Sequence, residues 1–130
     1  MQIDLDKINK LPPDVRDRFQ KLLIKYKEED KKELAQNDFL AFTKTIWPEF
    51  IEGEHHKTIA DKFNKLATGE IKRSIVNMPP RHTKSEFAST LLPAWMIGKN
   101  PKLKIIQTTH TGELAVRFGR KAKTLIDSPE

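Results

Sequence analysis

Hydrophobic positions recur at helical spacing near the start of the chain, over residues 14–34. The apolar members of this face are Val15, Phe19, Leu22, Leu23 and Tyr26. The second half of the segment, residues 25–33, mixes basic and acidic side chains with few apolar ones, which is typical of a solvated helical face. The pattern predicts one long amphipathic helix, and an arm that binds a partner is the alternative interpretation.

A short second helix is predicted directly after it. Asn37 or Asp38 is placed to cap a helix that runs to about Ile46. It should end before Trp47-Pro48, because proline disfavours helical geometry in the residue before it. We expect Trp47 to be a packing residue.

A third helix is predicted over residues 55–66, where Ile59, Phe63 and Leu66 share one face. Gly69 follows it as a C-terminal breaker. A short β-branched run at residues 71–76 then predicts a first strand, and residues 103–109 predict a second one.

Two more helices are predicted around the second strand. One runs from about Ser85 to about Ile97, and Pro93 predicts a kink or an early end in it. Thr111 is placed to cap the other. In that last helix the apolar positions are Leu114, Phe118, Ala122 and Leu125, and the basic positions that point elsewhere are Arg117, Arg120 and Lys123.

The order strand, loop, helix, strand, helix predicts an α/β fold, the opening of a parallel-sheet domain after N-terminal helices. Parallel sheets are normally several strands wide and covered on both faces. Because only two strands are predicted, we expect this chain to hold a truncated version of such a domain.

Composition limits what the chain can do. It has 130 residues, of which 37% are hydrophobic, enough for one small domain. It contains no cysteine, which excludes disulfide and thiolate chemistry and is compatible with a reducing cytosol. No apolar run approaches the roughly 20 residues that span a bilayer, so we expect a soluble, cytoplasmic protein.

The formal net charge is +6, and the positive excess is concentrated in the second half of the chain. Residues 71–130 carry 11 Lys and Arg against 4 Asp and Glu. Such an excess suits a polyanion, either a nucleotide or the DNA backbone, and a solubilising surface is the alternative.

The junction between the first strand and the next helix carries candidate chemistry. In the phosphate-binding loop pattern G-x-x-x-x-G-K-[ST], backbone N–H groups cradle phosphates, the lysine reaches their oxygens and the hydroxyl binds Mg²⁺. Aligning Lys84-Ser85 with this pattern places Met78 and Thr83 at the two glycine positions, so the pattern itself is not met. The alternative is an ordinary strand-to-helix turn in which Ser85 caps the helix.

The residues around this loop resemble a known family. Pro79-Pro80-Arg81-His82 followed by Lys84-Ser85 is similar to the Walker A region of large terminase subunits, the DNA-packaging motors of tailed bacteriophages and prophages. Many members carry glycine where this chain has Thr83. The similarity continues through Leu92-Pro93-Ala94-Trp95, the turn at residues 98–101 and the segment 104–110, and reaches back to residue 37.

The resemblance implies an ATP-driven motor, with Mg²⁺, that packages double-stranded DNA into procapsids in the host cytoplasm. Its implied partners are the portal protein, the small terminase subunit and further copies of itself in a ring. Residues 1–36 would form a helical arm, and residues 37–130 the N-terminal part of a P-loop ATPase domain. The family's acidic Walker B strand and nuclease carboxylates lie further along the chain and are absent from this sequence. We therefore expect an N-terminal portion that does not hydrolyse ATP by itself.

The resemblance also implies roles for the loop residues. Lys84 would bind the β- and γ-phosphates, Ser85 would bind Mg²⁺, and Arg81 would reach the γ-phosphate unless it binds solvent or a carboxylate. Backbone N–H groups from about Arg81 to Ser85 would form an anion nest. Thr83 departs from the family, which often has glycine at this position. A β-branched residue resists the positive φ that glycine adopts. The residues expected to line the nucleotide are Met78, Pro79, Pro80, Arg81, His82, Thr83, Lys84 and Ser85.

The histidines are candidates for metal and nucleotide binding. His55 and His56 are adjacent, so on a helix they point about 100° apart and make a poor metal pair. In the family an adenine-contacting segment often precedes this helix, which makes His56 a candidate adenine contact, with packing at the helix start as the alternative. His82 and His110 have no partner at ligand spacing, and we predict no structural metal.

Two other functions stay open. Another P-loop motor, such as a helicase, shares the same opening elements, although the Pro-Pro-Arg-His context favours a terminase. A non-catalytic fragment that binds nucleotide, DNA or partners without turnover would fit the missing acidic strand. Arg117 and Arg120 would either present charge to a neighbouring subunit or form an ordinary polar helix face.

Overall fold

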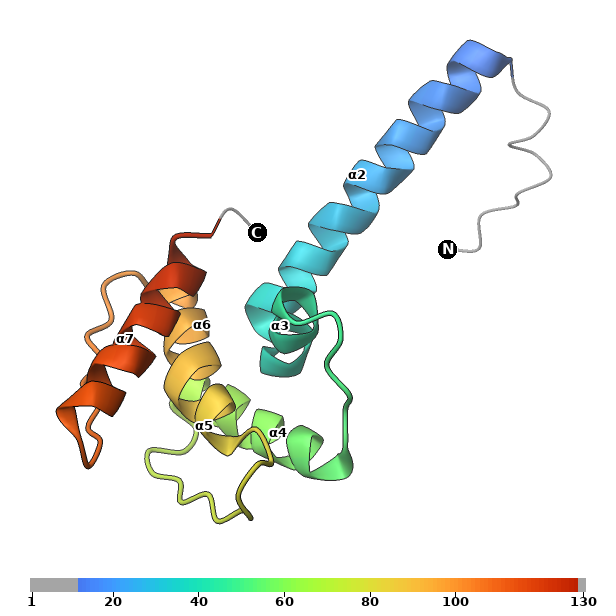
Figure 1. Ribbon diagram of the computed structural model, residues 1–130. Coiled ribbons are helices and arrows are strands. Elements are labelled where there is room, and N and C mark those ends of the chain that lie inside the picture. The colour runs from blue at the N-terminus through green and yellow to red at the C-terminus, as the bar shows by residue number, and fades with distance from the viewer. Residues whose placement is uncertain (1–11, 129–130) are drawn as a thin grey trace. The chain divides into compact units, whose positions relative to one another are not determined.

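The structure is a computed structural model that describes residues 12–128, and within that range its regular elements are all helical (Figure 1). They are α2 (Pro13–Asn37), α3 (Phe39–Ile46), α4 (Glu54–Thr68), α5 (Lys84–Glu86), the π-helix η1 (Phe87–Leu91), α6 (Leu92–Lys99) and α7 (Gly112–Ile126). The chain divides into two units, Met1–Glu33 and Leu34–Glu130. Each unit is described by itself.

The described part of the first unit is the N-terminal portion of α2. The predicted long helix is confirmed, and it starts at Pro13, whose missing N–H would have had no helical acceptor in the first turn. The side chains of Leu22 and Tyr26 on its apolar face are 64% and 67% exposed. Residues 12–33 therefore have no buried core of their own.

The second unit is built around Phe39, the first residue of α3, which is fully buried. Its ring meets those of Phe63, Phe87 and Trp95 edge to face, at centroid distances of 5.2, 5.4 and 5.5 Å. These rings come from α4, η1 and α6, so one side chain joins the three elements. Trp95 is anchored further by its indole N–H, which donates to the Ala35 carbonyl at 2.9 Å.

The ends of α3 and α4 follow the sequence signals. Asp38 caps α3 by accepting from the Ala41 N–H at 2.7 Å, and its second oxygen accepts from the Asn64 side chain at 2.8 Å. Gly69 ends α4 in the left-handed conformation with φ 77°, as a breaking glycine should. The predicted cap of the last helix is also confirmed, since Thr111 Oγ1 accepts from the Leu114 N–H.

The helix after the loop is longer than the sequence predicts. It runs without interruption over residues 84–99, so Pro93 does not end it. Instead the turn before Pro93 widens into the π-helix Phe87–Leu91. Proline has no N–H to donate to the preceding turn, and the Ser89 carbonyl there accepts from Gln107 Nε2 at 3.1 Å.

The α/β fold expected from the sequence is wrong for the described residues. Residues 71–76 and 103–109 contain no strand and no sheet ladder. Ile75 and Ile106 are 90% and 92% exposed, so β-branched residues in both segments face outward without a neighbouring strand. A strand is stable only when its backbone groups pair with an adjacent strand, and a sheet needs several strands with a buried face. Local β propensity therefore produced extended segments here, not a parallel sheet.

No helix within residues 12–128 combines the length and the apolar character needed to cross a membrane.

Candidate functional site

The segment between residue 77 and the helix that begins at Lys84 forms a tight turn whose backbone is unusual. Arg81 and Thr83 both have positive φ, at 66° and 58°. Among the described residues they are the non-glycine residues with a positive φ. A positive φ in a β-branched residue is an outlier that persists only where its surroundings hold it. Thr83 stands directly before Lys84-Ser85, at the position where phosphate-binding loops carry their second glycine.

The loop places Lys84 and Ser85 in the first turn of the helical segment 84–99. Lys84 folds back across the loop, and its Nζ donates to the Met78 carbonyl in a long contact of 3.4 Å. Ser85 is exposed and lies inside the first turn of the helix. It is therefore not the helix cap, although the ordinary turn interpretation required it to be. Thr83 holds the cap position but makes no side-chain capping bond. The first N–H groups of a helix have no intrahelical acceptor, which leaves them available to an anion.

The other loop residues differ in exposure. Met78 is half-buried and packs against the core cluster, whereas Pro79, Pro80, Arg81 and His82 are exposed. The His82 ring bonds to its own loop, because Nδ1 lies 2.9 Å from the Pro80 carbonyl and can reach it only as a donor. Arg81 is exposed and stands three residues before Lys84.

His56 connects the start of α4 to the loop. It is buried, at 6% exposure, and its Nδ1 accepts from the Gly53 N–H at 2.9 Å. Because Nδ1 is an acceptor, the ring proton is on Nε2, which donates to Thr83 Oγ1 at 2.8 Å. The Thr83 hydroxyl in turn donates to the His82 carbonyl at 2.7 Å. The expected packing role at the helix start is therefore present, and it reaches the loop itself.

Three histidine rings gather at this end of α4. The ring centroids of His55 and His56 are 3.8 Å apart, and those of His55 and His82 are 5.8 Å apart. Burial lowers the pKa of His56, and positive charge on His55 and His82 lowers it further, while Glu52 opposes them. Within residues 12–128 no set of three His, Cys, Asp or Glu side chains is arranged to hold a metal ion.

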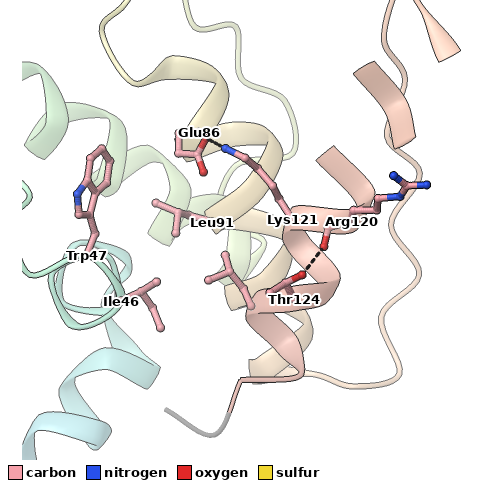
Figure 2. Close-up of a pocket in the computed structure, with 8 residues that line it drawn as sticks. Ile46, Trp47, Glu86, Leu91, Arg120, Lys121 and Thr124 are labelled. Atoms are coloured by element: carbon pink, nitrogen blue, oxygen red, sulfur yellow. Dashed lines mark hydrogen bonds and ion pairs between the residues drawn. The ribbon is translucent and has the colours of Figure 1, made fainter. Parts of the chain in front are cut away.

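A cleft lies between the end of α3, the start of the helical segment 84–99 and α7 (Figure 2). This cleft of about 420 Å³ has apolar walls that include Ile46, Trp47 and Leu91. At its edge Lys121 of α7 pairs with Glu86 of α5 at 2.9 Å, which ties α7 to the first turn after the loop. Trp47 lies on the wall, 36% exposed, and its ring contacts Phe50 at a centroid distance of 5.5 Å, so it packs only in part.

The basic positions of α7 lie outside this cleft or at its rim. Arg117, Arg120 and Lys123 are exposed, and Leu114, Phe118, Ala122 and Leu125 are buried or half-buried, as the sequence pattern predicts. In Figure 2 the Arg120 side chain extends away from the cleft. This is the geometry of a polar helix face, and the described residues show no target for these arginines.

Within the loop, Lys84 bonds to the Met78 carbonyl and His82 to the Pro80 carbonyl. His56, the candidate adenine contact from the sequence, joins the loop through its hydrogen bond to Thr83. Sequence reasoning missed this bond because it joins residues 27 positions apart. The available signal was the placement of His56 three residues after Gly53, where a helix side chain folds back to accept from the capping residue.

Comparisons with protein-family models, with curated proteins and with solved structures found no match to this chain.

Proposed function

We propose that residues 78–85 bind the phosphates of ATP with Mg²⁺, and that the chain is the N-terminal portion of a DNA-packaging motor of the large terminase type. The observation that supports this most directly is the left-handed backbone at Thr83, immediately before Lys84-Ser85 at the start of a helix. An ordinary helix cap needs no positive φ, whereas a loop that wraps around a phosphate does.

The residues present fit a phosphate group. Arg81 and Thr83 turn the backbone twice within three residues, which is the kind of bend that directs successive N–H groups to one side. Lys84 supplies a fixed positive charge, and its weak contact with the Met78 carbonyl is easily exchanged for a phosphate oxygen. The exposed Ser85 hydroxyl would hold Mg²⁺, and Arg81 would approach the terminal phosphate.

Bound ATP would supply the phosphoryl group whose transfer drives a motor, and Mg²⁺ would neutralise the charge on its oxygens. This chain's residues would bind and orient that group. The sequence has no apolar run that ends in Asp-Glu, so the activity we propose for these 130 residues is nucleotide binding. In the complete motor, hydrolysis and the packaging of double-stranded DNA would depend on an acidic residue elsewhere, on portal protein, on the small terminase subunit and on a ring of copies in the host cytoplasm.

Equilibrium titration with ATP and Mg²⁺, in wild type and Lys84→Ala, tests the proposal. Charge-assisted bonds to phosphate are worth about 1.5–3 kcal/mol, so removal of Lys84 should weaken binding by roughly 10- to 150-fold. Lys102→Ala is the matched control, because Lys102 is exposed just beyond the far end of the helical segment that Lys84 begins. Equal affinity of Lys84→Ala and wild type would exclude this loop as the nucleotide site.

A further inference from the structure

Thr83 occupies a conformation that its own side chain disfavours. Its φ of 58° lies in the left-handed region, where non-glycine residues are disfavoured roughly tenfold relative to the right-handed one. Threonine is a worse choice than most because its branched Cβ crowds the backbone. Some contact must therefore hold the residue where glycine would need no support.

The contact that does so comes from His56. The Thr83 hydroxyl accepts from His56 Nε2–H at 2.8 Å and donates to the His82 carbonyl at 2.7 Å, so its single proton and one of its lone pairs are used. A hydroxyl held from two sides fixes the rotamer of Thr83, and the bond to the neighbouring carbonyl fixes the peptide plane beside it.

His56 is itself held firmly enough to act as a support. Its Nδ1 accepts from the Gly53 N–H at 2.9 Å, and the ring packs against both Phe50 and Phe87, at centroid distances of 4.7 and 5.3 Å. Gly53 is the N-cap residue of α4, and His56 stands three residues after it. Because the ring is buried and bonded through both nitrogens, Thr83 is tied to the core and to the start of α4.

We propose that His56 is a positioning residue that holds Thr83 in the left-handed conformation and so replaces the glycine absent from the phosphate-binding loop. This inference rests on the proposed function, because the loop is positioned for an anion. It requires a neutral imidazole with its proton on Nε2, since a proton on Nδ1 would face the Gly53 N–H. The neutral form is also the one that burial favours by lowering the pKa of His56.

The test compares two substitutions at position 83 in the full chain, with ATP and Mg²⁺ as the probe. Thr83→Val removes the hydroxyl and keeps the branched Cβ, so it should weaken binding about tenfold, as His56→Ala should. Thr83→Gly removes the hydroxyl and also the need for support. In a chain that carries Thr83→Gly, adding His56→Ala should then change the affinity less than about twofold.

Two results would overturn the inference. If Thr83→Gly and Thr83→Val lose affinity alike, the hydroxyl matters for another reason than backbone conformation. If His56→Ala weakens binding equally with and without Thr83→Gly, His56 acts on the nucleotide or on the core, and not through Thr83.

A second measurement needs no nucleotide and separates this inference from the proposed function. Long-range ¹⁵N–¹H NMR of the wild-type chain should show His56 protonated on Nε2 at neutral pH. The Thr83 ¹³C shifts should report a left-handed backbone that is lost in His56→Ala. An Nδ1-protonated ring, or unchanged Thr83 shifts in that variant, would refute the inference that His56 holds the Thr83 backbone. Wild-type protein that shows both NMR signatures but does not bind ATP would refute the proposed function alone.

Discussion

Replacement of Phe39 tests whether one side chain holds the second unit together. The ring is fully buried and meets three other rings at 5.2–5.5 Å, each edge to face. Its backbone N–H donates to Asn64 Oδ1 at 2.9 Å, and a side-chain replacement keeps that bond. The expected loss therefore comes from packing alone.

Truncation of a buried phenylalanine to alanine costs about 3–5 kcal/mol, which covers lost burial and the cavity that remains. Each edge-to-face pair contributes about 0.5–1.5 kcal/mol beyond its buried area, so the three pairs place Phe39→Ala near the upper end, at about 4–5 kcal/mol. Phe39→Leu keeps most of the volume and loses the aromatic pairs, which predicts about 1.5–3 kcal/mol. Such a loss is a large share of the roughly 5–15 kcal/mol that a domain has in total.

Urea unfolding, followed by tryptophan fluorescence and by circular dichroism, measures these differences. Trp95 is buried against Phe39, so its emission reports this core. Ile51→Ala is the control, because Ile51 is 87% exposed and its removal should change stability by less than about 0.5 kcal/mol. A loss below about 2 kcal/mol for Phe39→Ala, or an equal loss for Ile51→Ala, would refute the central role of this ring.

Three further predictions follow from single contacts. Thr90 Oγ1 is buried and has no hydrogen-bond partner within the described residues, so Thr90→Val should raise stability by about 1 kcal/mol in urea unfolding, and any loss would contradict this. Asp38→Ala removes a helix cap and the acceptor for Asn64, which predicts a loss of about 1–2 kcal/mol, while Asp38→Asn should keep the cap and lose less. The pKa of His56 is lowered in the folded chain, so as the pH falls through 6.5 this histidine takes up a proton in the unfolded chain before it does so in the folded chain. Stability should therefore decline from about pH 7.5 towards pH 5, and His56→Gln should flatten that decline; parallel profiles would exclude His56 as its source.

The helices of this protein are determined largely by local sequence. Asp38 and Thr111 cap helices as predicted because a short polar side chain satisfies N–H groups a few residues away. Gly69 ends α4 for an equally local reason, its freedom to adopt positive φ. The faces of α4 and α7 also follow from spacing, since Ile59, Phe63 and Ala122 are buried.

The extended segments show where local sequence is insufficient. Ile75 and Ile106 have the β-branched side chains typical of strands, yet neither segment forms one within the described residues. A helix closes its hydrogen bonds within its own segment, whereas a strand depends on a neighbour that sequence pattern does not supply. The predicted α/β fold failed for that reason. Of the kink or early end predicted at Pro93, the early end did not occur: the π-helix Phe87–Leu91 precedes the proline, and Gln107 bonds to the Ser89 carbonyl.

The candidate site divides in the same way. The sequence alone determined which residues form the loop, because Met78 to Ser85 are contiguous and the Lys-Ser pair opens a helix. Only the tertiary structure decided the shape of that loop. It placed the His56 ring, from α4, against the Thr83 hydroxyl, and Thr83 has a positive φ that its local preferences oppose. A contact across 27 positions depends on how α4 packs against the core, and the packing of Phe50, His56 and Phe87 exists only in the folded chain.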